Sequence, residues 1–318
     1  MSVNKILKEL QKGAVQVANL LQKRDVEYTK DSNASGDNQL KVDVLADRLF
    51  ADILGELNVK GYASEEQEKA TYLGRESRDY GKALREDSKD SRAESKADSK
   101  ADSKIDFQSD VDYNISDLLV AYDPLDGSSL VDSNLTIGSI FGIYLNDFSG
   151  SNLIASAYFL YGPRLEMVAG VNHKSLHFVY NYVTHAWDFV QEIRLKDSGK
   201  INAPGGTQKF WSKKHKALIE SFFADGYRLR YSGGMVADLH QILCKGGGIF
   251  SYPATSDSPQ GKLRQLFEVF PFALIFEHAG GGAINENERI LNINTPHIHA
   301  TTPCYFGSRV EIQKILNG

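Results

Sequence analysis

Leu118-Leu-Val-Ala-Tyr-Asp-Pro-Leu-Asp-Gly-Ser-Ser129 is the most informative segment of this chain. Its first five residues are apolar and predict a buried β-strand. Asp123 and Asp126 follow on a bend that Pro124 stiffens and that Gly127 allows to turn tightly. Carboxylates can hold Mg²⁺, and the hydroxyl and N–H groups that come next can bind a phosphate. The alternative interpretation is an ordinary Asx-type turn capped by glycine and serine.

Length and composition define the broad class of the protein. The 318 residues are enough for two domains or one large layered domain, and the net charge of −5 gives no general attraction to nucleic acid or anionic membranes. Cys244 and Cys304 are too far apart to indicate a disulfide framework or a zinc ribbon. The N-terminal segment lacks a signal-peptide core, and no apolar run reaches membrane-spanning length. We therefore expect a cytoplasmic protein.

The N-terminal part of the chain predicts two helices. Apolar residues at helical spacing indicate a core-facing helix over residues 3–23, and the polar stretch 29–36 is typical of a mobile loop. Residues 40–54 predict a second helix, on which Asp43 and Asp47 share one face. Asp43 is bracketed by apolar residues, so its side chain faces either a site or the solvent.

Two further acids, Glu65 and Glu66, end a short strand predicted around residues 59–64. Acidic pairs are usually solvated, but this pair resembles Asp123 in following a strand. We therefore expect the two strand ends to be neighbours. Carboxylates brought so close repel each other, and a divalent cation relieves that repulsion.

The segment 75–108 is rich in Lys, Arg, Asp, Glu and Ser, and contains three tetrads of the Ala-acid-Ser-Lys type. It has almost no apolar face and cannot offset the entropy lost on ordering. We interpret it as a flexible surface insertion; a regulatory or docking role is the alternative.

The remainder of the chain predicts an α/β protein. Strands are expected over 135–144, 153–171 and 175–190, with Trp187 and Phe189 in the core, and a polar domain junction over 193–206. Beyond it, helices are predicted at 213–224 and 235–243, and strands at 227–231 and 246–252. The run 262–280 predicts a long buried helix in which Glu268 must be paired or bound to metal. His297 and His299 have the alternation of metal ligands, but a surface loop is favoured.

Taken together, these residues supply a set of acids with cationic and aromatic side chains around it. The acids are Asp43, Glu65, Glu66, Asp123, Asp126 and Glu268. Arg230, Lys262 and Arg264 are candidate phosphate or sugar binders. Carboxylates without thiolate or histidine ligands favour Mg²⁺ or Mn²⁺ over zinc, and two or more such ions can clamp a phosphate and activate water.

Seven motifs occur in a specific order, and together they resemble the class I fructose-1,6-bisphosphatases. They are Gly36-Asp37 with Lys41-Val-Asp43, Ser64-Glu65-Glu66, Asp123-Pro-Leu-Asp-Gly-Ser-Ser129, Ile137-Gly-Ser-Ile-Phe-Gly-Ile-Tyr144, Arg230 to Asp238, Gly248 to Ala254, and Gly261 to Glu268. They span nearly everything except the insertion. Within the wider group of lithium-sensitive sugar and inositol phosphatases, Leu125 and Ser128 match the bisphosphatases.

The resemblance implies a layered α/β/α/β/α fold, a homotetramer, and a Mg²⁺-dependent gluconeogenic phosphohydrolase that removes the 1-phosphate of fructose 1,6-bisphosphate. It divides the chain into a metal- and 1-phosphate-binding domain (1–192) and a domain for the sugar and 6-phosphate (193–318). The implied metal ligands are Glu65, Asp123, the Leu125 carbonyl, Asp126 and Glu268. The implied catalytic residues are Glu66 and Asp43, supported by Asp37. The implied substrate ligands are Gly127, Ser128, Ser129, Asn202, Tyr231, Met235, Tyr252 and Lys262, with Arg230 from a neighbouring subunit.

The sequence departs from the family at several positions. Leu130 replaces the usual asparagine, and Gly205 and Gly206 stand where a 6-phosphate-binding tyrosine is expected, which broadens the range of sugars to consider. Asp117, Leu118 and Leu145 replace residues of the AMP-inhibited members, so AMP inhibition at that site is not expected. Sedoheptulose-1,7-bisphosphatase or dual activity is the alternative within the same chemistry. A non-catalytic regulatory homologue is the alternative of another class.

Overall fold

The computed structural model describes residues 2–23, 28–32, 38–73, 107, 111 and 113–317 of the chain. Asp37 and nearly all of the predicted insertion at 75–108 lie outside these residues. Phe107, at the end of the insertion, is described: it is buried, and its ring lies 5.2 Å from that of Phe178.

The elements alternate as an α/β protein requires. The helices are α1 (Ser2–Leu21), α2 (Lys41–Leu57), α4 (Lys213–Ala224), α5 (Met235–Cys244), α6 (Phe270–His278) and α7 (Arg309–Leu316). The strands are β1 (Tyr28–Ser32), β2 (Asn38–Leu40), β3 (Gly61–Ser64), β4 (Thr71–Tyr72), β5 (Leu118–Asp126), β6 (Ile137–Leu145), β7 (Leu153–Tyr161), β8 (Leu165–Val171), β9 (Lys174–Asn181), β10 (Ala186–Ile193), β11 (Ile201–Pro204), β12 (Arg228–Leu229), β13 (Ile249–Tyr252), β14 (Leu263–Arg264), β15 (Gly282–Ile284), β16 (Thr301–Thr302) and β17 (Cys304–Gly307). Short helical turns include η2 (Ile115–Asp117), η3 (Ser128–Leu130), η4 (Gly150–Asn152), η5 (Gln208–Phe210), η7 (Ile290–Asn292) and the π-turn η6 (Gln265–Val269).

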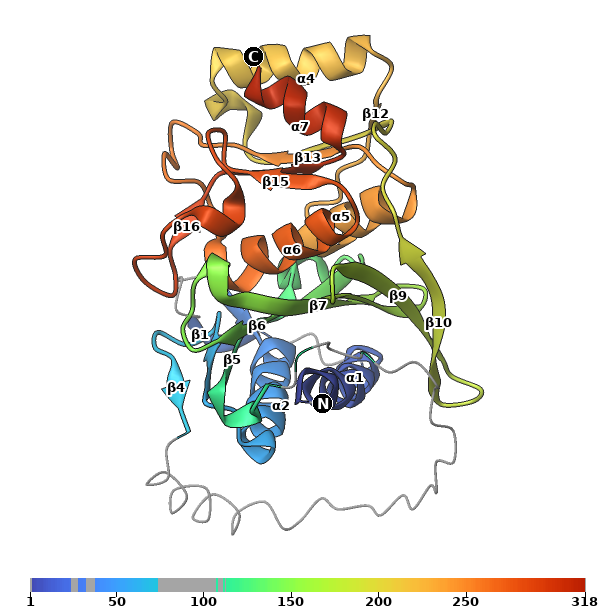
Figure 1. Cartoon of the computed structure of the whole chain (residues 1–318), viewed down its shortest axis with the longest axis vertical. Helices are drawn as coiled ribbons and strands as arrows, with labels where there is room; N and C mark the ends of the chain where they lie inside the picture. The colour runs from blue at the N-terminus through green and yellow to red at the C-terminus, as the bar shows by residue number, and fades with distance from the viewer. Residues whose placement is uncertain are drawn as a thin grey trace.

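Five layers are stacked along the long axis of the molecule (Figure 1). Helices α1 and α2 cover one face of an eight-stranded sheet, ordered β10-β9-β8-β7-β6-β5-β3-β4. Helices α5 and α6 lie between that sheet and a five-stranded sheet, ordered β12-β11-β13-β17-β15. Helices α4 and α7 cover the outer face of the second sheet. This arrangement confirms the predicted α/β/α/β/α fold.

The central strands are apolar along their whole length because both faces of the large sheet are covered. All nine residues of β5 are buried, as are eight of the nine in β6. Such continuous apolar runs are expected of strands packed on two sides. The core therefore holds β5 rigidly up to Asp126.

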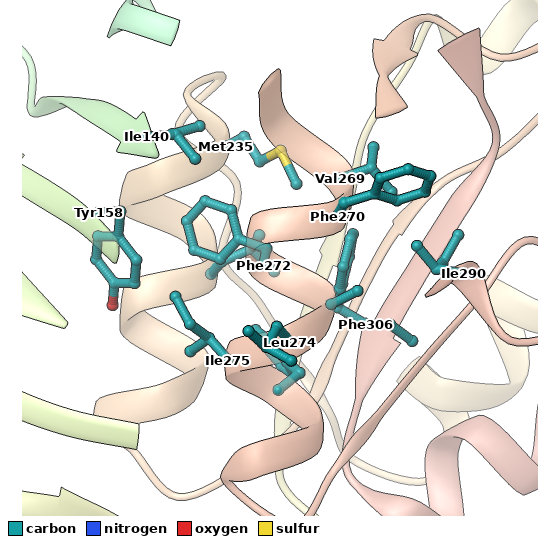
Figure 2. Close-up of a cluster of buried hydrophobic side chains, with 14 of the residues drawn as sticks. Ile140, Tyr158, Met235, Val269, Phe270, Phe272, Leu274, Ile275, Ile290 and Phe306 are labelled. Carbon is teal, nitrogen blue, oxygen red and sulfur yellow. The ribbon is translucent and has the colours of Figure 1, made fainter. Parts of the chain in front are cut away.

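Helix α6 is almost wholly apolar because it lies between the two sheets. Figure 2 shows Phe272 and Ile275 of α6 beside Tyr158 of the large sheet, and Phe306 of the smaller sheet next to the same helix. A helix that is hydrophobic all round is a buried helix. The predicted burial of this run is confirmed.

Several predictions about local structure were wrong. The loop predicted at 29–36 overlaps β1, which pairs with β2, and its residues 33–36 lie outside the described part of the chain. The long helix predicted at 262–280 begins instead with β14, which pairs with the distant β16, and becomes helical only at η6. The segment 193–206, predicted to be polar, contains β11, which is entirely buried; its role as a domain junction stays a prediction. Trp187 is buried as predicted, but Phe189 is 42% exposed.

Other predictions are confirmed. Helix α4 has the predicted bounds, and residues 297–299 form a turn in a loop. The division at 192/193 stays a prediction. Among the described helices, none has the length and apolarity needed to cross a bilayer.

Candidate active site

The site begins where two parallel strands end. Strands β3 and β5 pair in parallel, with Ser64 opposite Tyr122, and the backbone N–H of Glu65 donates to the Tyr122 carbonyl at 3.0 Å. Parallel neighbours present their carboxyl ends at the same edge of a sheet. Glu65 and Asp123 therefore emerge side by side, as the sequence predicted.

A β-bulge brings Asp123 and Asp126 together. In a regular strand, residues three apart point to opposite faces. Here Asp123 lies opposite Ile140 and Asp126 lies opposite Gly138, so one residue of β6 faces two of β5. The extra residue returns both carboxylates to one face, a role that bulges commonly have beside active sites.

Glu268 completes a buried acidic cluster. It lies on η6, and its carboxylate oxygen is within 4.8 Å of oxygens of Asp123 and Asp126. Burial raises the pKa of Asp123 well above its ordinary value, and the charges of Glu65 and Asp126 raise it further. Burial also raises the pKa of Asp126 to about 6 and that of Glu268 to about 7, against opposing hydrogen bonds. The cluster holds more negative charge than it can comfortably accommodate without cations.

Arg264 is the cation that this cluster already contains. Its Nη2 lies 2.6 Å from Glu65 Oε1, and its backbone N–H donates to Glu268 Oε2 at 2.6 Å. The sequence suggested Arg264 only as a phosphate or sugar binder, and no local signal indicated an ion pair with Glu65, which lies about 200 positions earlier. Arg264 offsets one charge among four carboxylates.

Two backbone contacts fix the aspartates. The Leu125 N–H donates to Asp123 Oδ1 at 2.9 Å, so the Asx-type turn is present alongside the acidic cluster. The Val236 N–H donates to Asp126 Oδ2 at 2.9 Å. Val236 lies in the first turn of α5, where free N–H groups favour an anion.

The predicted proton-transfer residues are Asp43, on α2, and Glu66, which directly follows Glu65. Asp43 is buried in the first turn of α2, and Glu66 is half-buried, with its N–H donating to Ser64 Oγ at 3.2 Å. Asp47, one turn after Asp43, accepts from Ser64 Oγ at 2.5 Å and from Tyr122 Oη at 2.8 Å. Asp47 thus braces both strand ends. Its spacing from Asp43 in the sequence was the available signal for this role.

The donor set fits a hard divalent cation. Asp123, Asp126 and Glu268 offer oxygen ligands within one small buried volume, and Glu65 is close enough to raise the pKa of all three. Mg²⁺ and Ca²⁺ prefer such ligands, whereas zinc favours nitrogen and sulfur. The acidic cluster can therefore hold a hard metal ion.

Comparison with known proteins places this geometry in a family. Residues 99–192 match the fructose-1-6-bisphosphatase N-terminal domain, and residues 195–317 match the C-terminal domain. A class 1 fructose-1,6-bisphosphatase from Helicobacter hepaticus is 48% identical over 98% of this chain and 97% of the relative. The chain belongs to the class 1 fructose-1,6-bisphosphatase family. A member of this family from Campylobacter jejuni is 42% identical over 99% of this chain and 98% of its own.

Solved structures agree with this family assignment. Leishmania major fructose-1,6-bisphosphatase in its holo form matches with a TM-score of 0.82 and 26% identity, covering 98% of this chain and 93% of the other. A putative sedoheptulose-1,7 bisphosphatase from Toxoplasma gondii matches with a TM-score of 0.78 and 25% identity, covering 100% and 98%. This fold is therefore shared with a fructose-1,6-bisphosphatase and with a protein described as a putative sedoheptulose-1,7 bisphosphatase.

The residues predicted to bind the 1-phosphate follow Asp126 directly in the sequence. Gly127 has φ +80°, a conformation that glycine adopts without strain, and it starts the turn η3 that contains Ser128 and Ser129. Leu130, the departure from the family, is half-buried, and a Cβ built on Gly234 would lie 3.2 Å from its Cδ1. Leu130 therefore packs against the Gly233-Gly234 segment before α5.

Residues expected at the 6-phosphate pocket are distributed around Gly205. A Cβ on Gly205 would meet Tyr252 Cδ2 at 2.5 Å and Tyr231 Cε2 at 3.2 Å, so the glycine lets both rings close over the backbone. Asn202 is fully buried, and neither its Oδ1 nor its Nδ2 has a hydrogen-bond partner among the described residues. Arg230 is exposed.

The two predicted sugar ligands have contrasting environments. Lys262 is exposed just before β14, free to reach a ligand. The Met235 side chain lies in the buried cluster near Ile140 (Figure 2), so a sugar contact from this residue would have to come from its backbone. Asp37 lies outside the described residues.

Proposed function

We propose that this chain hydrolyses the 1-phosphate of fructose 1,6-bisphosphate to give fructose 6-phosphate and phosphate. The observation that carries the proposal is the bulge that places Asp123 and Asp126 with Glu268, directly before the turn η3. The family membership of the chain supports the substrate. We expect this activity in the cytoplasm.

In this proposal Glu65, Asp123, the Leu125 carbonyl, Asp126 and Glu268 hold two or more Mg²⁺, with Mn²⁺ as an alternative. Bound Mg²⁺ supplies charge neutralisation at the phosphate and lowers the pKa of a bound water. Gly127, Ser128 and Ser129 hold the phosphate by N–H and hydroxyl donors. Lys262 and the Met235 backbone contact the sugar.

Glu66 and Asp43 orient the attacking water and accept its proton, with Asp37 in support. The water oxygen forms a bond to phosphorus in line with the departing sugar oxygen, whose bond to phosphorus breaks. The sugar oxygen takes up a proton from solvent as it leaves, the carboxylate that accepted the water's proton returns one to solvent, and inorganic phosphate remains at the turn η3. Burial of the acids keeps this reaction in a low-dielectric site, which strengthens each charge interaction.

The assembly we propose is a homotetramer in which Arg230 reaches the 6-phosphate of a neighbouring subunit, beside Asn202, Tyr231 and Tyr252. The exposed position of Arg230 supports this role, and its guanidinium donates to the carbonyl of the adjacent Leu229 at 2.8 Å. Light scattering tests the tetramer. Mixing Arg230→Ala subunits with subunits inactive through Glu66→Gln tests the shared site, because hybrids should contain some intact pairs.

Sedoheptulose 1,7-bisphosphate is the second candidate substrate. The specific observation in its favour is Gly205, which stands where the family carries a tyrosine and leaves the distal phosphate pocket to Tyr231 and Tyr252. Phosphate release from both bisphosphates, with and without Mg²⁺, separates the candidates by their kcat/KM ratio. If neither bisphosphate released phosphate in a Mg²⁺-dependent way, the result would favour the alternative that the chain is a non-catalytic homologue.

A further inference from the structure

A second cluster of metal-ligating side chains lies away from the active site, between α5 and strands β8 and β9. His240 and Cys244 share one face of α5, four positions apart, and His177 of β9 and Glu166 of β8 face them. One ligand atom each from His177, His240 and Cys244 lies within 4.8 Å of the others. We propose that His177, His240 and Cys244, with Glu166 beside the two histidines, form a structural site for a soft divalent transition metal such as Zn²⁺.

Two distances between the ligand atoms, both to His240 Nε2, suit tetrahedral coordination. Cys244 Sγ lies 3.4 Å from His240 Nε2, and Glu166 Oε2 lies 3.3 Å from the same nitrogen. Metal–ligand bonds of the usual zinc lengths place neighbouring ligand atoms about 3.3 to 3.8 Å apart. The 2.6 Å contact between Glu166 Oε2 and His177 Nε2 is a hydrogen bond that has to open slightly.

The outer contacts have the pattern found around metal ligands. Arg164 donates to Glu166 Oε1 at 2.7 Å through Nε, which leaves Oε2 directed at the histidines. Tyr158 Oη lies 2.8 Å from His240 Nδ1, so Nε2 is the nitrogen facing the cluster. Such partners orient ligand rings and fix their tautomer.

A hydrogen-bonded network without metal is the simpler alternative. In such a network the Cys244 thiol has long contacts to the His240 ring, with Sγ 3.4 Å from Nε2 and 3.9 Å from Nδ1. With a metal bound, Cys244 would lose its proton to solvent as the S–metal bond forms, and the divalent charge would balance Glu166 and the thiolate.

Because its ligands are a sulfur and imidazole nitrogens, this site would bind a different class of metal ion from the active site. The active-site donors are oxygens and select hard cations, whereas the cluster at α5 selects soft ones. A metal bound at this cluster would hold the C-terminal end of α5 against β8 and β9. At the other end of the helix, the Val236 N–H in the first turn of α5 donates to Asp126. The metal would therefore brace the helix whose other end meets the active site.

Cobalt provides the test, because a Co²⁺–thiolate bond gives a charge-transfer band that oxygen ligands do not. Full-length protein in excess Mg²⁺ is titrated with Co²⁺. We expect one equivalent to bind with this band and to release one proton. Cys244→Ser should abolish the band, and Cys304→Ala, which removes the other cysteine of the chain, should retain it. Arg164→Gln should weaken binding by about 10- to 100-fold.

No thiolate band in the wild type, or a band that survives Cys244→Ser, overturns the proposal. Circular dichroism establishes that each variant folds. If Cys244→Ser does not fold, the alkylation rate of Cys244 in the wild type, measured with and without Zn²⁺, tests the proposal instead. Zn²⁺ should slow alkylation of Cys244 at least about tenfold, since a metal-bound thiolate is shielded. An unchanged alkylation rate also overturns the proposal.

Discussion

Asp126 and Val236 connect the two halves of the active site: the carboxylate at the end of β5 accepts the N–H of the first turn of α5 at 2.9 Å. The two residues are 110 positions apart in the sequence. Any ion or phosphate bound at Asp126 is thereby coupled to the position of α5. The acidic cluster and the helix dipole act on the same carboxylate.

Asp126→Asn should lower the activity of the enzyme and raise the stability of the metal-free protein. The amide oxygen can still accept from Val236, but one buried charge is removed from the acidic cluster. We expect kcat to fall by at least about 10²-fold, and the metal-free protein to gain about 1 kcal/mol in free energy of unfolding. Mg²⁺ should raise the Tm of the wild type more than that of the variant. A metal-free variant less stable than the wild type would contradict the account of charge crowding.

Glu66→Gln should leave substrate binding largely intact and lower kcat by at least about 10²-fold, the usual scale for a lost general base. Glu68→Gln is the matched control, since Glu68 is exposed two positions further on. Steady-state phosphate release gives kcat and KM for both variants. An unchanged kcat in Glu66→Gln removes Glu66 from the assigned role.

Arg264→Gln should destabilise the metal-free protein. Arg264 pairs with Glu65 at 2.6 Å, and removing one partner of a largely buried pair costs about 3 kcal/mol. Urea unfolding measures the loss, and Mg²⁺ should restore part of it by replacing the missing cation. Arg309→Gln is the control, because its pair with Asp197 is exposed and worth about 1 kcal/mol or less.

Acid should destabilise the protein partly through His215. Burial lowers the pKa of His215 to about 4 from 6.5, and its ring packs against Trp211 and Tyr305. Because the unfolded state binds the proton more readily, this stability is present above pH 6.5 and is lost as pH falls toward 4. The contribution lost at pH 5 is about 2 kcal/mol.

His215→Phe should therefore flatten the decline in unfolding free energy between pH 7 and pH 5. His185→Asn is the control, because His185 is exposed and its φ of +53° suits asparagine. An equal decline in His215→Phe and the wild type would show that His215 is not the group responsible.

AMP should not inhibit this enzyme at the position used by the AMP-regulated members of the family. Leu118 lies opposite Leu145 across β5 and β6, and Leu118 is fully buried. Two leucines offer a phosphate neither charge nor hydrogen-bond donors. Phosphate release measured over a range of AMP concentrations should show no saturable inhibition. Inhibition that disappears on changing Leu118 would refute this expectation.

The sequence could predict that the acids of the active site meet, because the residues around each acid indicated where it lies. Glu65 follows the short strand β3, and Asp123 follows the apolar run that begins β5; the two strands pair in parallel, so the two acids lie side by side. Glu268 stood out as a carboxylate in an apolar run. The approach of these groups within a few ångströms follows from the packing of rigid elements.

Long-range pairing explains what the sequence did not reveal. Leu263 and Arg264 are extended because they pair with Thr301 and Thr302, residues almost forty positions away. The polar segment Tyr28–Ser32 is a strand because β2 pairs with it. Phe189 has the alternation of a core residue, but it lies on β10, the edge strand of the large sheet. Local propensity cannot report such partners.

The bulge between Asp123 and Asp126 has a consequence for how this site tolerates change. In a regular strand the two carboxylates would share a face only at a spacing of two or four positions, and the bulge makes a spacing of three possible. Deleting Leu125 would therefore remove the need for the bulge and leave both aspartates on one face, but it would take away the carbonyl proposed as a metal ligand. A homologous chain that kept the spacing of three and lost the bulge would turn the second aspartate toward the opposite side of the sheet, and it should lack the centre even where every acid is present.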